Sequence, residues 1–599
     1  MSTTQRTLTA IGVYLAFAVL MAACILPAGR TPTADAPMLL ARSQRLVDLL
    51  LSGEQSALFT AVAGQVIPQP PLGFITAAPA FLPGDLHAAP LLAGLIGLAG
   101  VWAGMCMGAR RTDTLLLPGV PLAAAGMLWA SPMTWAAAEQ ALWDLLCAGW
   151  IALSIGALVN SDRLRHRRWT TLAGALAGGA TLVKYNAPLF LIVPLSVVAL
   201  QALRERRWTD VVRLILAGAV PLILWAPCAA AELMPYLGAS LGEGPADSAS
   251  DIPTFAERFW WVHASYYPAV LKSALGWPGL FLLVGALGAT RSESGRIPLI
   301  SGLSGMIFLM LIGRREPRYL IPAIPMMLLA AEIGWMMLPR RRFRLAGFAL
   351  IAIVSGYQMY GTAWTYRNWA DPKPLLQLRF GPEQLQSWGH WPFPPSQWVP
   401  TSSAAEAWKV PQLVDAAGRA KGPSEVTTVG FLMYAHPQIP PADLYVLEAA
   451  RRGWRWDRYD LEILSAHGAG PARPTVRPGR NPAANQGDDP NAPRLPGQPP
   501  PRSQDEEEFL IIADPGPLAN LVEPAPFSLL ITVSLRQDPF YQAFFHQLGA
   551  ERIETFELPH RQQGVLWRID EAAWRGPIGQ QVFQALHGRD EDLNIGFAP

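Results

Sequence analysis

The sequence predicts a mainly α-helical protein that crosses a membrane many times and ends in a soluble α/β domain. Its 599 residues are 51% hydrophobic and only 15% charged, with a mean hydropathy of +0.22, which is too apolar for a soluble chain of this length. Apolar runs of about 20 residues recur as far as residue 361, and the remainder is polar. The net charge of +2 gives no indication of a nucleic-acid partner.

The apolar runs predict about eleven transmembrane helices. The first run follows Arg6 and is long enough to cross a bilayer, so we interpret it as a retained helix rather than a cleaved signal peptide. Ten further runs lie near residues 88–108, 115–134, 138–159, 170–183, 186–203, 212–232, 268–289, 297–313, 319–338 and 344–361. The two short runs on either side of "KYNA" are predicted to be separate helices of a hairpin.

The basic residues of the short loops predict the orientation, because positive charge is retained on the cytoplasmic side. With the N-terminus in the cytoplasm, the loops that fall inside are the basic segments 109–113, 161–170, 204–213, 290–296 and 339–344. A single helix in place of the "KYNA" hairpin would put the basic segment "PRRRFR" outside, so the pattern supports the hairpin. An odd number of spans places everything after residue 361 outside the cytoplasm.

Two domains are predicted. Residues 1–361 form a multi-spanning domain with large outer loops at 29–87 and 234–267, and an amphipathic helix in the first loop is expected to lie in the membrane interface. Residues 362–599 form an extracytoplasmic α/β domain with a disordered insertion near 466–508, which is rich in Pro, Gly, Asn and charge. The β-rich runs of this domain are 424–432, 460–465, 508–514, 527–535, 552–558 and 564–569.

Charged side chains in or beside the membrane mark the candidate site, because their placement there costs free energy. Asp35 follows the first span, and it is either a catalytic group or the N-cap of the next helix. Asp144 lies inside the predicted helix 138–159, where a polar contact between helices is the alternative to a functional role. Lys184 lies in the outer turn "KYNA". It either has a functional role or merely extends its side chain toward the membrane interface.

The outer loop "GRREPRY" contradicts the distribution of positive charge seen elsewhere. It carries Arg314, Arg315 and Arg318, and a guanidinium fork matches the oxygens of a phosphate group. A lipid phosphate is therefore the negative partner that we expect. The alternative is that one of the arginines forms an ion pair with Glu316 or with a carboxylate of the first outer loop.

The order of these elements resembles the membrane-embedded GT-C glycosyltransferases, and more narrowly the branch that holds the protein O-mannosyltransferases and the lipid A aminoarabinose transferase. The resemblance covers residues 1–361 and is carried by an Asp after the first span, an Asp in a later span, and the stretches "PQPPLGFITAAPAFLPG", "TLVKYNAPLFLIVP" and "RYLIPAIPMMLLAA". It implies that a sugar is transferred, with inversion, from a polyprenyl-phosphate donor to a lipid, glycan or protein at the outer face of the membrane. The Ala-, Arg- and Pro-rich composition favours a bacterial inner membrane.

The resemblance also implies roles for individual residues. The catalytic residues that it implies are Asp35 and Asp144. Asp35 corresponds to the residue that accepts the acceptor's proton, and Asp144 corresponds to the acidic residue of the later outer helix. The residues implied for the donor phosphate are Lys184, Arg314, Arg315, Arg318 and Tyr319.

A divalent metal ion is implied only in part. The aminoarabinose branch has Glu-Lys where this chain has Pro68 and Gln69, and this difference removes one metal ligand. His263 is the remaining candidate ligand, although an isolated histidine among aromatic residues is more often structural.

Two other classes of function remain open on the sequence. A transporter or flippase of polyprenyl-linked glycans would use a basic outer site too, but it would need repeated halves or pairs of broken helices, which the sequence does not indicate. A non-catalytic membrane scaffold would leave Asp35 and Asp144 replaceable.

Overall fold

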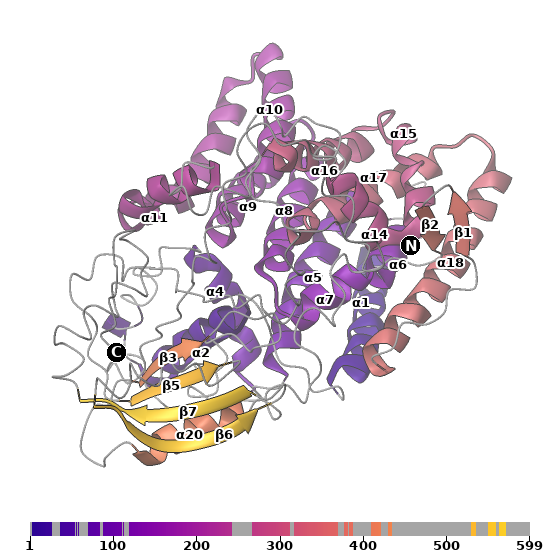
Figure 1. The fold of residues 1–599 in the computed structure, drawn as a ribbon. Coiled ribbons are helices and arrows are strands. Elements are labelled where there is room, and N and C mark those ends of the chain that lie inside the picture. Colours follow the sequence, from indigo (N-terminus) through magenta and orange to yellow (C-terminus); the bar gives the residue numbers. More distant parts are fainter. Residues whose placement is uncertain are drawn as a thin grey trace, which may run out of the picture. The chain divides into compact units, whose positions relative to one another are not determined.

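The computed structural model describes residues 3–26, 36–53, 55–56, 58, 70–83, 88–110, 112, 119–241, 266–311, 317–368, 377–380, 383–386, 409–420, 429–433, 529–534, 549–558 and 562–570. The chain divides into two compact units, Met1–Glu406 with Ala449–Gly453, and Ala407–Glu448 with Trp454–Pro599 (Figure 1). The boundary that the sequence places after residue 361 stays a prediction.

The first unit contains the long apolar helices. Its helices are α1 (Thr3–Ile25), α2 (Ala36–Ser52), α4 (Pro71–Ala77), η2 (Ala78–Phe81), α5 (Ala89–Ala109), α6 (Leu122–Ala130), α7 (Pro132–Glu139), α8 (Trp143–Asn160), α9 (Arg167–Val183), α10 (Pro188–Arg204), α11 (Trp208–Leu241), α14 (Tyr266–Leu283), α15 (Ala286–Ala289), α16 (Glu293–Leu311), η4 (Pro317–Leu320), α17 (Ala323–Met336) and α18 (Arg341–Asn368). A short hairpin, β1 (Gln377–Phe380) and β2 (Glu383–Gln386), follows them.

Each predicted span has a helical counterpart, but the helices are not all long. Among the described residues, seven helices are long and apolar enough to cross a membrane. A further pair of helical segments, Tyr266–Gly276 and Gly279–Ala289, is bent at a break inside α14 and brings the total to as many as eight. Three predicted spans fall short of this length, because α9 and α10 each have 17 residues and the span 115–134 is divided between α6 and α7. Residues 184–187 separate α9 from α10, so two helices rather than one flank "KYNA", as predicted.

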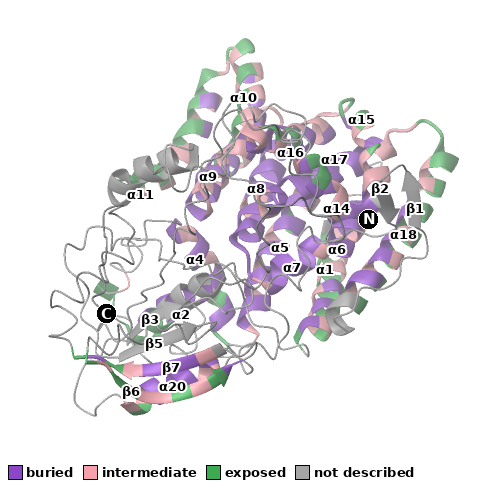
Figure 2. Ribbon diagram, in the orientation of Figure 1, coloured by how far each residue is buried: buried purple, intermediate pink, exposed green. Residues whose placement is uncertain are grey.

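The core of the unit is formed by α5, α8 and α17 (Figure 2). Helix α8 packs on α5 along one side and on α9 along another, and α9 in turn packs on α11. Glycines allow these close contacts, since a Cβ on Gly149 of α8 would lie 2.8 Å from the carbonyl oxygen of Gly97 in α5. The close packing fixes both ends of α8 relative to their neighbours.

The predicted span 115–134 is broken in the structure. Helix α6 ends at Ala130, Ser131 is extended (φ −71°, ψ 122°), and Pro132 begins α7. The break frees the carbonyl of Ala130, which accepts hydrogen bonds from the Thr362 hydroxyl (2.8 Å) and the Gln358 amide (3.4 Å) of α18. Buried polar groups of α18 therefore replace the helical hydrogen bonds that the break removes.

The amphipathic helix of the first outer loop is present as α2, which packs against α4 and η2. Leu40, Leu46 and Val47 are buried, whereas Leu50 and Leu51 are 61% and 72% exposed. Exposed leucines beside a packed apolar face are consistent with the predicted contact with a membrane surface.

The second unit contains a four-stranded sheet with the strand order β3-β5-β7-β6. The strands are β3 (Val429–Met433), β5 (Leu529–Ser534), β6 (Glu551–Leu558) and β7 (Gln562–Arg568). Strands β3 and β5 are parallel and the other neighbours are antiparallel, and α20 (Val410–Ala420) packs on β6 and β7. Four of the six predicted β-rich runs form these strands; the runs 460–465 and 508–514 and the insertion near 466–508 lie outside the described residues.

Candidate functional site

Four of the predicted site residues lie together in the first unit. The Asp144 carboxylate is 1% exposed, and its Oδ1 accepts a hydrogen bond from Lys184 Nζ at 2.6 Å. Arg318 Nε lies 4.0 Å from the other carboxylate oxygen, Oδ2. Lys184 Nζ also lies 4.8 Å from the centre of the Tyr319 ring. We call these four residues, Asp144, Lys184, Arg318 and Tyr319, the charged cluster.

Asp144 is held at the N-terminus of α8. The chain reverses after α7 through Ala141, which has a positive φ of 49°, and α8 begins at Trp143. Asp144 therefore lies in the first turn of the helix. The predicted helix 138–159 would have placed it deeper. This position favours a carboxylate, because the N-terminal end of a helix carries partial positive charge.

Lys184 is held at the opposite type of helix end. It is the C-cap of α9, with an extended backbone (φ −155°, ψ 133°), and its N–H donates to the carbonyl of Ala180. The C-terminal end of a helix carries partial negative charge and favours a cation. The two helix ends thus stabilise the ion pair in the same sense as its own Coulomb attraction.

Arg318 and Tyr319 come from the short helical turn η4. Pro317 and Leu320 of this turn are buried, and the Ile321 N–H donates to the Arg318 carbonyl at 3.0 Å. Helix α17 follows directly from Ala323. The buried, proline-framed turn fixes the backbone from which the guanidinium group reaches Asp144, and the Arg318 side chain itself is 12% exposed.

The stretch "PLGFITAAPAF" packs next to the charged cluster. It forms α4 and η2, and the Phe74 ring contacts the Trp143 ring edge to face with a centroid distance of 4.5 Å. A Cβ on Gly73 would lie 3.1 Å from the same indole ring. The residue before Asp144 is therefore fixed by a segment that belongs to the predicted outer loop 29–87.

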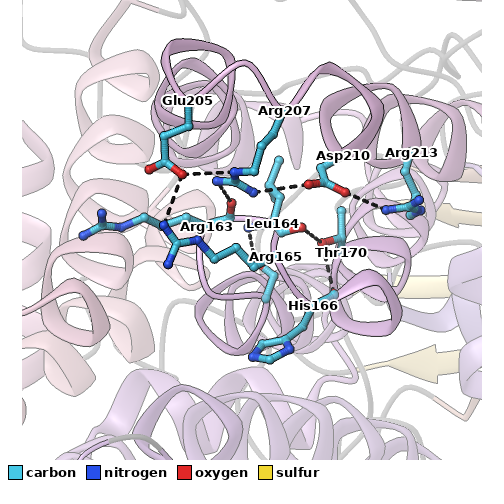
Figure 3. A network of polar contacts seen from close by, with 10 residues as sticks. Arg163, Leu164, Arg165, His166, Thr170, Glu205, Arg207, Asp210 and Arg213 are labelled. Atoms are coloured by element: carbon cyan, nitrogen blue, oxygen red, sulfur yellow. Dashed lines mark hydrogen bonds and ion pairs between the residues drawn. The ribbon is translucent and has the colours of Figure 1, made fainter.

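The opposite end of α8 carries a second polar network (Figure 3). Arg163, Asp162 and Leu164 form a left-handed turn with φ of 51° to 70°, and the Arg163 carbonyl accepts a hydrogen bond from Arg207 Nη2. The ion pairs of this network join Arg163 to Glu293, Arg165 and Arg207 to Glu205, and Arg207 and Arg213 to Asp210. The network ties the start of α16 and the α10–α11 connection to the end of α8.

The two polar clusters are separated by the length of one membrane span. Helix α8 has 18 residues, which is roughly 27 Å at 1.5 Å per residue, close to the ~30 Å hydrocarbon core of a bilayer. Helix α9 runs between the same two clusters, from Arg167 to Val183. The charged cluster and the arginine-rich network therefore lie at opposite ends of α8 and α9.

Several predicted site residues are outside the described part of the chain. Asp35 immediately precedes α2, and Arg314 and Arg315 precede η4, but none of the three is described. The same holds for His263. Their assignment to the site stays a prediction.

The described residues do not fit a metal ion. No group of three or more His, Cys, Asp or Glu side chains in this part of the structure is arranged to hold one. The single carboxylate of the charged cluster, Asp144, already contacts two cationic side chains. We therefore derive no chemical step from a metal.

One polar residue of the site was not singled out from the sequence. Asn186 follows Lys184 in the turn between α9 and α10, and both polar atoms of its side chain are buried without a hydrogen-bond partner. The quoted "KYNA" contained the signal, but an asparagine in a turn is ordinarily explained by its turn conformation.

The arrangement of the helices has a match among solved structures. The apo crystal structure of ArnT from Cupriavidus metallidurans matches with a TM-score of 0.55 and 12% identity, covering 96% of this chain and all of that one. The structure of the same protein bound to undecaprenyl phosphate matches with a TM-score of 0.55 and 12% identity, covering 94% of this chain and 98% of that one. No protein-family model and no curated protein sequence matches the chain.

These comparisons define the class of fold. The chain is an integral membrane protein with the fold of the GT-C membrane glycosyltransferases, as the resemblance implied. Within that class the fold is similar to that of ArnT from Cupriavidus metallidurans.

Proposed function

We propose that the protein transfers a glycosyl group from a polyprenyl-phosphate sugar to an acceptor at the outer face of a bacterial inner membrane, with inversion. The observation that supports this most strongly is the charged cluster, which brings Lys184, Arg318 and Tyr319 together around Asp144 at one end of a membrane-length helix. The likeness to a structure with bound undecaprenyl phosphate supports the same class of donor. The acceptor is a lipid, a glycan or a protein.

The location of the charged cluster suits this donor. A polyprenyl phosphate keeps its chain in the hydrocarbon region and its phosphate at headgroup depth, where we propose that α8 begins. Lys184 and Arg318 provide N–H donors of the kind that bind phosphate oxygens, and the Arg318 guanidinium group can bind two oxygens at once. Arg314 and Arg315, which precede η4 in the sequence, are proposed to join them.

Asp144 is proposed to act through its neighbours. Its 2.6 Å contact with Lys184 and its 4.0 Å separation from Arg318 indicate that it holds both cations in place. The sequence analysis grouped it with the catalytic residues, whereas these contacts favour a positioning role. Removing its charge would leave two cations close together with one fewer partner.

The proposed reaction is a single displacement at the anomeric carbon. The acceptor oxygen attacks this carbon, the bond from carbon to the phosphate oxygen breaks, and the acceptor's proton passes to the carboxylate of Asp35. The polyprenyl phosphate leaves with one more negative charge than it had in the donor. Lys184 and Arg318 would stabilise that charge as it develops, which lowers the free energy of the transition state.

The test is transfer of label from a polyprenyl-phosphate sugar in membranes that contain the protein. Wild-type membranes should move label from undecaprenyl-phosphoryl sugars into a product fraction, and Asp35→Asn should be inactive while remaining folded. A variant at the other end of α8, Arg165→Gln, should retain activity. Movement of the labelled lipid across the bilayer without cleavage of its sugar would instead indicate a flippase, and unchanged transfer by Asp35→Asn would reject the assigned base.

A further inference from the structure

The turn that carries Lys184 also carries a side chain with unmet hydrogen-bonding capacity. Asn186 Nδ2 and Oδ1 are both buried, and neither has a hydrogen-bond partner in the described structure. The backbone carbonyl of the residue has a partner, because it accepts from the Leu189 N–H at 3.1 Å. The unpartnered group is therefore the carboxamide alone.

An unpartnered carboxamide is an unfavourable choice for this position. Burying an amide without hydrogen bonds costs free energy that an apolar side chain of similar size would avoid. Asn160, at the other end of α8, shows the ordinary arrangement, since its Nδ2 donates to the carbonyls of Met107 and Gly156, each at 2.7 Å. The contrast indicates that the partner of Asn186 is a water molecule or a bound ligand rather than a group of the protein.

The chemistry of the amide narrows the choice of partner. A carboxamide offers two N–H donors and one carbonyl acceptor, and both kinds of atom are unpartnered in Asn186. A phosphate oxygen only accepts hydrogen bonds and would leave Oδ1 unsatisfied. A sugar hydroxyl both donates and accepts, so it satisfies either side of the amide.

We propose that Asn186 binds a hydroxyl group of the donor's sugar and thereby helps to select which sugar is transferred. This inference rests on the proposed function, in which Lys184, two residues earlier, binds the donor phosphate. A sugar joined to that phosphate would lie within a few bonds of it. Lys184 would then bind the phosphate of the donor, and Asn186 would bind its sugar.

The binding experiment uses the full-length protein in lipid nanodiscs. Its ligands are undecaprenyl phosphate and undecaprenyl-phosphoryl glucose, mannose and 4-amino-4-deoxyarabinose. In Asn186→Leu, affinity for the sugar that the wild type binds best should fall about tenfold, while affinity for sugar-free undecaprenyl phosphate stays within about twofold. An equal fall for both kinds of ligand, or no fall for either, would overturn the inference.

A stability measurement separates a ligand-binding amide from a structural one. Without ligand, Asn186→Leu should unfold at the same temperature as the wild type or higher, because it removes an unsatisfied buried amide. The matched control Asn160→Leu should unfold at a lower temperature, since it removes two hydrogen bonds. Destabilisation of Asn186→Leu to the same extent as Asn160→Leu would show a structural partner and overturn the inference.

The two levels of the proposal fail in different ways. If the wild type binds no undecaprenyl phosphate with or without a sugar, the proposed function and the role of Asn186 are both wrong. If the wild type binds these lipids but Asn186→Leu does not alter the preference among sugars, only the role of Asn186 is wrong.

Discussion

Asp144 and Lys184 form a 2.6 Å ion pair in which the carboxylate is 1% exposed and the lysine side chain 16% exposed. The pair joins the first turn of α8 to the C-cap of α9 across 40 residues of sequence. It therefore links the packing of α8 on α9 to the geometry of the proposed phosphate site.

The ion pair predicts that the effects of substituting Asp144 and Lys184 on the free energy of unfolding are not additive. Lys184→Met leaves a buried carboxylate with one partner fewer, and it should lower the free energy of unfolding by about 3 kcal/mol. The double variant Asp144→Leu with Lys184→Met should recover most of that loss, because the buried carboxylate is removed together with its lysine partner. Only the more distant contact with Arg318 is then lost. Thermal unfolding of the three proteins in the same detergent measures this, and equal loss in the single and double variants would contradict it.

The buried Glu332 of α17 predicts a second effect on stability. Its Oε2 accepts a hydrogen bond from the Ala124 N–H at 2.8 Å, at the N-terminus of α6, and the residue is 1% exposed. Glu332→Gln retains an acceptor and should change the free energy of unfolding little, whereas Glu332→Leu should cost about 1–3 kcal/mol by leaving the N–H unsatisfied. Similar unfolding temperatures for the two variants would disprove the capping role.

The contact between α5 and α8 predicts that Gly104 does not tolerate a side chain. A Cβ at this position would overlap the backbone of Ala152, so Gly104→Ala should destabilise the protein by about 1–3 kcal/mol. The matched control is Gly356→Ala in α18, where nothing lies within 4 Å of the added Cβ. That control should be neutral or slightly stabilising, since alanine favours a helix over glycine. Equal effects would contradict the packing of α5 on α8.

The polar network at the end of α8 predicts a small dependence of stability on pH. The hydrogen bond from Arg165 lowers the pKa of Glu205 below its ordinary value of 4.5, with Arg207 acting in the same sense. A pKa that is lowered in the folded state stabilises the protein above pH 4.5, and this contribution is lost as the pH falls through the folded-state pKa. The wild type should therefore exceed Glu205→Gln in unfolding temperature at pH 7, and the difference should shrink on acidification. A difference that grows toward low pH would have the wrong sign.

The sequence predicted the members of the charged cluster because of where they lie in the chain. Charged residues are costly in or beside apolar spans, which singled out Asp144 and Lys184. Arg318 was singled out because clustered arginines are unusual in an outer loop. Sequence spacing did not reveal that α8, α9 and η4 would bring them within contact distance. That proximity depends on which helices become neighbours, and this in turn depends on glycine-mediated contacts such as that of Gly97 with Gly149.

Other features were less accessible to sequence reasoning. The break at Ser131 lies within one continuous apolar run, and its stability depends on hydrogen bonds from Gln358 and Thr362, which are far away in the sequence. Asn186 was missed because only the structure shows that its amide has no partner. In the second unit, by contrast, runs of β-branched and aromatic residues were sufficient to predict all four described strands of the sheet.

The most direct test of the account is the affinity of the protein for undecaprenyl phosphate in nanodiscs. Arg318→Gln, and the double variant of Asp144 and Lys184 described above, should each weaken binding about tenfold or more, because each loses a charged donor to the phosphate. Arg165→Gln, which alters a 54% exposed arginine at the other end of α8, should bind as the wild type does. Equal affinity in all four proteins would contradict the claim that the charged cluster binds the phosphate of a polyprenyl lipid.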